Sequence, residues 1–295
     1  MNSTVVSRDA AALTVGELLE VVTAQLESGR VESPLRDATD IVSALLDVPR
    51  FWPAANRESD AASSVAVAAK RAAALRIAGA PLAYAVGRAS FRHLTLEVDE
   101  NVLIPRVETE ILVERLLERA SLDVRSVADI GTGSGAIALS LALEREFDSV
   151  VGTDISLGAL RIAGRNAERL GGALRSPVQF LHGALLAPLA GRRVDAVVCN
   201  PPYIAYSEGE ALPPSVRDWE PALALVCADE GLSVTRNVIA QAPALLSPGG
   251  ILALEVDTRR AGMVAEIVAV DGRYVAVEVL PDLTGRERFV FARRA

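Results

Sequence analysis

Residues 126–135, SVADIGTGSG, decide the fold of this chain. Their apolar start predicts a buried strand, Ser126–Ile130, and the glycines that follow lead into a helix beginning near Ala136. Glycine lets the backbone turn sharply and approach a ligand closely, as at the carboxyl edge of a nucleotide-binding sheet. The stretch has neither the Gly-Lys-Ser/Thr ending of a phosphate loop nor the third glycine of the dinucleotide pattern. It therefore favours a nucleoside without a pyrophosphate, although a purely structural turn is the alternative.

Strands and helices alternate downstream of this loop. The expected strands are Val150–Asp154, Val178–Leu181, Asp195–Cys199, Ile251–Val256, Tyr274–Leu280 and Arg288–Ala292, and the expected helices start at Leu157, span Leu232–Leu246 and end near Val268. Such alternation with short turns predicts an α/β fold with a mostly parallel sheet covered on both faces.

The first part of the chain has the pattern of a separate helical domain. Thr14-Val15-Gly16-Glu17 has the form of a capping box, Ser33-Pro34 opens a second helix, and an Ala-rich helix covers roughly Ala61 to Ile77. Alternating apolar residues between Leu94 and Val98 then suggest a hairpin. We expect a helical domain at 1–87, a β-hairpin linker at 88–104 and a catalytic domain at 105–295.

Composition restricts the class of protein. A net charge of −8 and a pI near 5.0 argue against sequence-specific nucleic-acid binding, which normally needs a basic face. The sequence has no apolar run long enough to span a bilayer, and its start, Met1-Asn2-Ser3-Thr4, does not resemble a secretory signal. With two cysteines and two isolated histidines, we expect no disulfide framework, no metal site and a cytoplasmic location. Nothing in the sequence demands more than a monomer.

An acid at the end of the next strand strengthens the nucleoside reading. Asp154 stands where dinucleotide folds place a carboxylate for ribose hydroxyls, although capping a helix begun near Ser156 is the alternative. Together with the glycine loop it points to S-adenosylmethionine. The predicted cofactor-binding residues here are Asp129, Gly131, Thr132, Gly133, Ser134, Gly135 and Asp154.

A rigid turn follows the strand that ends at Cys199. Asn200-Pro201-Pro202-Tyr203 cannot continue a strand, because proline lacks an N–H, and each proline forces the residue before it into extended geometry. The turn resembles the Asp/Asn-Pro-Pro-Tyr signature of methyltransferases that act on nitrogens conjugated to a π system. Such a nitrogen is a poor nucleophile until its N–H groups are oriented. Asn200 Oδ1 and the Pro201 carbonyl could accept those two N–H groups, while Tyr203 packs on the planar substrate group.

The linker resembles that of bacterial release factor glutamine methyltransferases. That family carries a Pro-x-x-Tyr-x-x-Gly run, a Phe in the hairpin and then Ile-Pro-Arg-Pro-x-Thr-Glu. The matching residues are Pro81, Tyr84, Gly87, Phe91, Ile104, Pro105, Arg106, Thr109 and Glu110. Further matches lie in VRDWEPALAL (216–225) and DLTGRERFV (282–290), so the resemblance covers nearly the whole chain.

This resemblance implies a Rossmann-like class I S-adenosylmethionine-dependent methyltransferase. The implied reaction methylates the side-chain amide nitrogen (N5) of the glutamine in the Gly-Gly-Gln motif of class I peptide chain release factors, with S-adenosylhomocysteine as product. The implied catalytic residues are Asn200, Pro201 and Tyr203. Pro202 and Arg106 join these three in the substrate site, and Leu185 and Asn200 extend the cofactor site. The helical domain would help dock the factor.

Two features depart from the family pattern. Val107 replaces the usual proline of the linker, and Ala184 and Leu185 stand where many members place an acid and often an aromatic near the adenine amine. Contact with adenine would here be apolar and made through the backbone. A salt bridge from Arg106 to Glu108 or Glu110 is as compatible with the sequence as a substrate role.

Alternative functions remain open at this point. A glutamine methyltransferase of a ribosomal protein would carry closely similar motifs. An adenine-N6 nucleic-acid methyltransferase would be expected to bring a basic recognition domain, and a non-catalytic module could dock on release factors without turnover. The intact glycine loop, Asp154 and Asn200 argue against the last.

Overall fold

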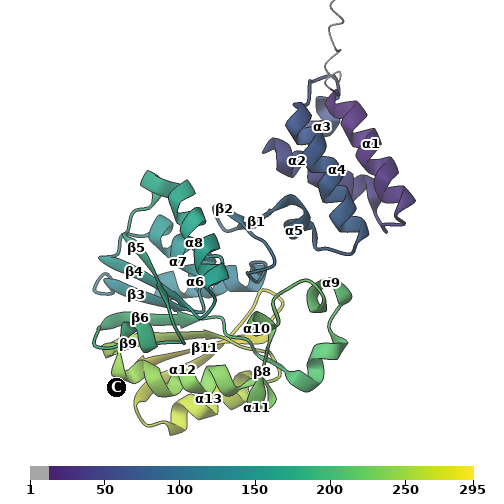
Figure 1. Ribbon diagram of the computed structural model, residues 1–295. Helices are drawn as coiled ribbons and strands as arrows, with labels where there is room; N and C mark the ends of the chain where they lie inside the picture. Colours follow the sequence, from purple (N-terminus) through teal and green to yellow (C-terminus); the bar gives the residue numbers. More distant parts are fainter. Residues whose placement is uncertain (1–12) are drawn as a thin grey trace, which may run out of the picture. The chain divides into compact units, whose positions relative to one another are not determined.

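The computed structural model describes residues 13–295 (Figure 1). Residues 1–12 lie outside the described part. The expectations about Met1–Thr4 and about the start of the 1–87 domain concern these residues and therefore lie outside it as well. Two compact units divide the chain, Met1–Arg88 and Ala89–Ala295. No helix in residues 13–295 is long and apolar enough to cross a membrane.

The first unit is built from helices. They are α1 (Val15–Ser28), α2 (Pro34–Leu46), α3 (Trp52–Ala55), α4 (Ser63–Ile77) and α5 (Leu82–Val86). The predicted capping box is present, since the Glu17 N–H donates to Thr14 Oγ1 while Thr14 N–H donates to the Glu17 carboxylate. Leu18, Val22 and Ile41 are fully buried in the shared core of α1, α2 and α4. These side chains lie at helical spacing, so one face of each helix closes the core.

The second unit contains a seven-stranded sheet in the order β10-β11-β9-β6-β3-β4-β5. The strands are β3 (Ser126–Ile130), β4 (Ser149–Asp154), β5 (Val178–His182), β6 (Val194–Cys199), β9 (Leu246–Glu255), β10 (Tyr274–Pro281) and β11 (Glu287–Arg294). The five strands from β9 to β5 pair in parallel, and β11 and β10 add an antiparallel edge. The prediction of a mostly parallel α/β sheet is confirmed.

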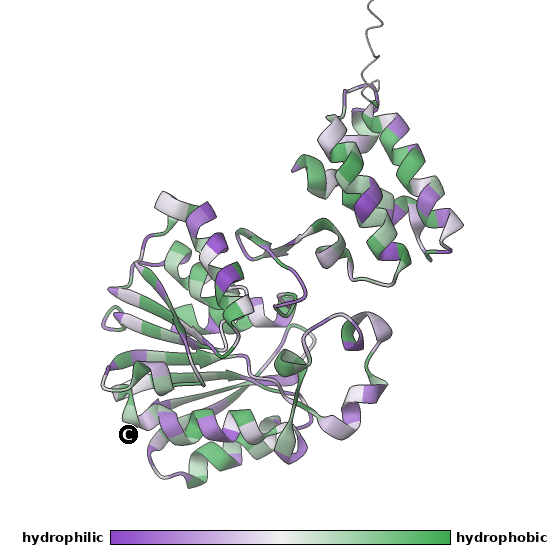
Figure 2. Cartoon of the chain, viewed as in Figure 1, coloured by the Kyte–Doolittle hydropathy of each residue, from purple (hydrophilic) through white to green (hydrophobic). Residues whose placement is uncertain are grey.

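Helices cover both faces of this sheet. One face carries α6 (Val107–Arg119), α7 (Ala136–Glu144) and α8 (Leu157–Leu170), and the other carries α12 (Ser233–Gln241) and α13 (Ala261–Val270) (Figure 1). Leu112 and Leu139 are buried on the first face, and Val238 and Val264 on the second. The central strands are predominantly hydrophobic (Figure 2), as expected for parallel strands buried on both sides.

A small hairpin precedes the sheet and is anchored to it. It consists of β1 (Arg88–Phe91) and β2 (Leu94–Glu97), with Phe91 and Leu96 fully buried against the core of the second unit. Asn166 of α8 pairs with the Glu97 backbone, accepting from its N–H at 2.7 Å and donating to its C=O at 3.1 Å. The hairpin therefore leads into α6 from a fixed position on the second unit.

The region between β6 and β9 differs from the sequence expectation. It contains β7 (Ile204–Ala205), η3 (Tyr206–Ala211), α9 (Pro214–Arg217), α10 (Ala222–Leu225), β8 (Val226–Cys227) and α11 (Ala228–Gly231), none of which was predicted. The helix predicted over Leu232–Leu246 is too long, because α12 ends at Gln241 and Pro243 cannot supply the N–H that would continue it. The next strand starts at Leu246, earlier than predicted.

Candidate active site

The glycine loop between β3 and α7 is held from inside by a buried acid. Asp129 is fully buried, and its Oδ2 accepts hydrogen bonds from Thr132 Oγ1 (2.6 Å) and Ala138 N–H (3.1 Å). Burial raises the pKa of Asp129 to about 7, although both hydrogen bonds act to lower it. Gly131 and Gly133 have positive φ angles of 73° and 55°, and no atom lies within 4 Å of where a Cβ would stand. Only glycine adopts this backbone without strain, and the space before it is open to a ligand.

Asp154 joins this loop to the next one. Its Oδ2 accepts from Gly133 N–H at 2.9 Å, and its Oδ1 accepts from Ser156 N–H at 2.8 Å. The hydroxyl of Ser156 caps α8 by accepting from Ala159 N–H, so the cap does not depend directly on Asp154. A carboxylate has about four acceptor positions, and two remain for a ligand hydroxyl.

A cavity of about 300 Å³ opens at the carboxyl edge of β3, β4 and β6. Its walls come from both loops, from the turn after β6 and from the segment before α6. The lining residues include Asn101, Gly131, Gly133, Asp154, Leu185 and Asn200. Leu185 has a positive φ of 49°, and its carbonyl accepts from buried Thr153 Oγ1 at 2.8 Å. The volume lies at the lower end of the range for small-molecule sites.

A second, smaller cavity of about 200 Å³ adjoins the first. The two share the lining residues Leu103, Asn200, Pro201 and Ala224. Tyr203 and Arg106 line only the second. The Asn-Pro-Pro-Tyr turn thus forms a wall that the two cavities share.

Asn200 is oriented by a chain of hydrogen bonds. Its Nδ2 donates to Thr109 Oγ1 at 2.9 Å, and Thr109 Oγ1 donates to Glu255 Oε2 at 2.7 Å. Thr109 lies on α6 and Glu255 ends β9, and both side chains are buried. The amide of Asn200 therefore directs its donor group to Thr109, which leaves Oδ1 as an acceptor.

The remainder of the turn is fixed by the segment after β8. Cys227 Sγ donates to the Pro202 carbonyl at 3.1 Å. A Cβ on Gly231 would stand only 2.3 Å from the Tyr203 carbonyl oxygen, and Asp229, Glu230 and Gly231 all have positive φ. A left-handed turn is costly for residues other than glycine. Burial, followed by the nearby Glu255 charge, raises the pKa of the Tyr203 phenol, which keeps it neutral.

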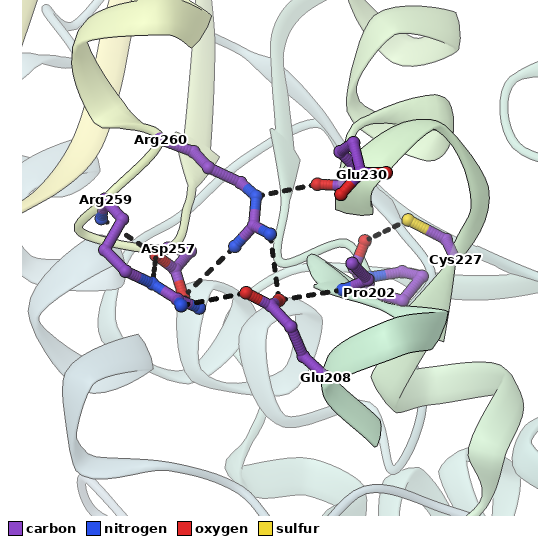
Figure 3. Close-up of polar contacts among 8 residues, drawn as sticks. Pro202, Glu208, Cys227, Glu230, Asp257, Arg259 and Arg260 are labelled. Carbon is purple, nitrogen blue, oxygen red and sulfur yellow. Dashed lines mark hydrogen bonds and ion pairs between the residues drawn. The ribbon is translucent and has the colours of Figure 1, made fainter. Parts of the chain in front are cut away.

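Arginine side chains brace the other side of this segment (Figure 3). Arg260 donates through Nε to the Glu230 carbonyl (2.7 Å) and through Nη2 to Glu208 (2.8 Å). Glu208 also accepts from Ala205 N–H just after the turn, and Arg259 bridges Glu208 and Asp257. Only 9% of Arg260 is exposed. The network links the β9–α13 connection to both ends of the insertion, which is the segment from β7 to α11.

Arg106 forms an ion pair that the sequence did not predict. Its Nη2 lies 2.5 Å from Glu220 Oε1, and the other oxygen of Glu220 accepts from Ile104 N–H at 3.1 Å. The sequence left a salt bridge with Glu108 or Glu110 open as one alternative, and in the structure the partner is Glu220 instead. Only 4% of Glu220 is exposed, and an unpaired charge at such a buried position is strongly destabilising. The ion pair with Arg106 therefore stabilises the contact between the linker and the insertion. Arg106 also lines the second cavity.

Comparisons with known proteins show the family of this chain. Residues 107–212 match the family described as "Methyltransferase small domain". The chain is 40% identical to the release factor glutamine methyltransferase of Moorella thermoacetica over 96% of this chain and 99% of that one. It is 37% identical to that of Deinococcus radiodurans over 95% and 98%. The chain belongs to the release factor glutamine methyltransferase family.

The fold is also seen among solved structures. The catalytic domain of hMettl16, in complex with MAT2A 3′UTR hairpin 1, has a TM-score of 0.56, 18% identity, and coverage of 86% of this chain and 91% of that one. At this identity the likeness concerns the fold alone. The Rossmann-like class I methyltransferase fold predicted from the sequence is confirmed.

In the structure of this family member, the predicted site residues lie in the two cavities and in and beneath the glycine loop. Gly131, Gly133, Asp154, Leu185 and Asn200 line the first cavity. Tyr203 and Arg106 line the second, Pro201 lines both, and Pro202 lines the first. Asp129 is buried beneath the loop, Thr132 and Ser134 are buried residues of the loop itself, and Gly135 is the N-cap of α7 with a φ of 83°.

Sequence reasoning missed the residues that support the Asn-Pro-Pro-Tyr turn in this family member. Glu255, Cys227, Gly231 and Arg260 received no role. One signal was available for Glu255: an acid stands at the carboxyl end of the apolar run ILALEV, next to the strand that ends before Asn200. A buried acid at that edge indicates a site.

Proposed function

We propose that this protein transfers the methyl group of S-adenosylmethionine to the side-chain amide nitrogen (N5) of the glutamine in the Gly-Gly-Gln motif of class I peptide chain release factors. The observation that carries the proposal is Asn200 at the wall between two cavities, with its Nδ2 bound to Thr109. Family membership supports the same reaction.

The residues around the first cavity fit the methyl donor. Asp154 keeps acceptor positions for ribose hydroxyls, and the open space before Gly131 and Gly133 suits an uncharged nucleoside at close range. Leu185 and Ala184 offer adenine an apolar wall. When bound, S-adenosylmethionine supplies a sulfonium-activated methyl group.

Asn200 and Pro201 would prepare the substrate nitrogen from the second cavity. Asn200 Oδ1 and the Pro201 carbonyl accept its two N–H groups, which opposes delocalisation and directs the lone pair at the methyl carbon. With the amide held by Asn200 and Pro201, transfer would form the N–C bond in place of the S–C bond, and the nitrogen would lose one proton to water. No protein base is needed because the methylated amide is strongly acidic before that loss.

Labelled methyl transfer to a purified class I release factor tests the proposal. We expect label on the intact factor and none on the same factor with its Gly-Gly-Gln glutamine changed to alanine. Asn200→Ala should abolish transfer while calorimetry shows cofactor binding largely retained. Label on neither factor would contradict the release factor assignment, and label on a ribosomal protein would replace it. Equal label on both factors would contradict the glutamine assignment.

We also propose that the first unit helps dock the factor. Phe51 and Leu35 on that unit are 75% and 64% exposed, which suits contact with another protein. Phe51→Ser should raise the KM for the release factor and leave kcat at saturation unchanged. An unchanged KM would argue against contact at Phe51.

A further inference from the structure

Hydrogen-bond direction around Thr109 determines how Asn200 can face its substrate. A hydroxyl has one proton to donate, whereas an ionised carboxylate can only accept. When Glu255 is ionised, the proton of Thr109 is committed to Glu255 Oε2 at 2.7 Å. Thr109 can then only accept from Asn200, and the atom that faces it at 2.9 Å must be the donor Nδ2.

The opposite orientation of Asn200 is disfavoured while Glu255 is charged. It would bring Oδ1 against the oxygen of Thr109, so two acceptors would face each other without a proton. It would also turn Nδ2, a donor, toward the N–H groups of the substrate amide. Loss of one such hydrogen bond with a buried group left unpaired corresponds to roughly a 10- to 100-fold preference.

We propose that Glu255 and Thr109 are positioning residues that hold Asn200 with its acceptor oxygen toward the methyl-accepting amide. This inference rests on the proposed function and adds two residues that do not themselves touch the substrate. Neither residue lines either cavity, and Glu255 is 0% exposed.

The burial of Glu255 supports a functional role, because the placement is costly. Its Oε1 is a buried atom without a hydrogen-bond partner among the described residues. Burial raises the pKa of Glu255 to about 7, against the hydrogen bond from Thr109. The other ionisable groups that influence or face it are Arg288, Glu108, Arg106, Tyr203 and Cys199. The two arginines favour the charged form, and Glu108 opposes it.

Protonation of Glu255 would remove the constraint. Its carboxyl could then donate to Thr109, and the released proton of Thr109 could point to Asn200 Oδ1. Both orientations of the amide would become available. The rate of transfer should therefore fall as the pH drops below about 7.

Three variants and one control test the proposal with the full chain. At pH 8 we expect kcat to fall roughly 10- to 100-fold in Thr109→Val and roughly tenfold in Glu255→Gln, as one misdirected hydrogen bond implies. Thr109→Ser keeps the hydroxyl and should stay within about threefold of wild type. Thr235→Val removes a hydroxyl that is equally buried on α12 and should leave kcat unchanged. The Kd of the cofactor should be the same in all four.

The pH profile separates positioning from a merely structural role. Wild-type kcat at saturating cofactor should show a step near pH 7, and Glu255→Gln should lose it. Burial also raises the pKa of Asp129 to about 7, so any step caused by Asp129 is common to wild type and Glu255→Gln, and the difference between the two profiles reports Glu255. The proposal would be overturned if Thr109→Val or Glu255→Gln had the same kcat as wild type. It would also be overturned if the pH profile of Glu255→Gln kept the same step as wild type.

A spectroscopic readout does not depend on the substrate. The side-chain amide resonance of Asn200, assigned by its loss in Asn200→Ala, should shift between pH 6 and pH 8 in wild type and not in Glu255→Gln. Wild type that fails to methylate the factor but shows this shift would contradict the proposed function and leave the positioning role intact. Active wild type without the shift would contradict the positioning role alone.

Discussion

The two halves of the site are built in different ways. The donor half, the loops after β3 and β4, is held by contacts between neighbours in the fold, such as Asp129 with Thr132 and Asp154 with Gly133. The acceptor half, the turn after β6, is held by side chains from α6, β8 and the end of β9, and by the close approach of the α11 backbone at Gly231. The geometry of the donor half follows from a short sequence motif, whereas the geometry of the acceptor half depends on contacts across the second unit. Substitutions far from Asn200 should therefore impair acceptor chemistry while the cofactor still binds.

Gly231→Ala should give the largest effect of this kind. The added Cβ would stand 2.3 Å from the Tyr203 carbonyl oxygen, at a φ of 82° that alanine rarely adopts. We expect a loss of about 2–4 kcal/mol in stability and at least a tenfold fall in transfer. Gly172→Ala, where no atom lies within 4 Å, is the matched control. Thermal unfolding and labelled transfer measure both effects, and a neutral Gly231→Ala would refute the close contact.

Asp154→Ala should impair the donor half alone. It removes two hydrogen bonds within the loops and the acceptors proposed for ribose. Calorimetry should show cofactor affinity weakened roughly 10- to 100-fold, with the KM for the release factor unchanged at saturating cofactor. Asp148→Ala removes an exposed acid and should change neither value. A matching rise in the release factor KM would show that the two halves are not separable.

Glu255→Gln should stabilise the protein at high pH even as it slows transfer. The folded pKa of about 7 exceeds the ordinary 4.5, so the folded state binds the proton more tightly than the unfolded state. Proton binding by Glu255 therefore stabilises the folded wild type at low pH, and this stabilisation is lost as the pH rises from about 4.5 to 7. The variant should gain about 2 kcal/mol at pH 8 and little at pH 5. Equal thermal midpoints at pH 8 would contradict a buried charge.

Ala184→Asp should produce the smallest change. It restores the acid that many family members place near the adenine amine, at a position that lines the first cavity. One added hydrogen bond should tighten cofactor binding by about three- to tenfold without changing the KM for the factor. Weaker binding in calorimetry would mean that the adenine does not approach this wall through its amine.

Sequence patterns predicted the donor half well because its geometry is local. The strand Ser126–Ile130 and the helix start at Ala136 match the structure, and the glycines mark the turn between them. The acceptor half was predicted only at its centre. Thr109 lies 91 positions before Asn200 and 146 positions before Glu255 in the sequence. No periodicity encodes contacts between residues so far apart. The insertion was missed because its short elements have no independent hydrophobic pattern.

The parallel pairing of β7 with β8 has a consequence for how this enzyme family could be diversified. Ile204–Ala205 lies beside Val226–Cys227, so the intervening segment leaves and returns at one place. The entropy of closing such a loop grows slowly with its length, by about 0.6 kcal/mol per doubling. Residues grafted at the exposed tip near α9 would leave the Asn-Pro-Pro-Tyr turn in place. Because Leu212 and Val216 of this segment also line the second cavity, exchanging the segment would change the surroundings of the proposed substrate site while the turn stays anchored.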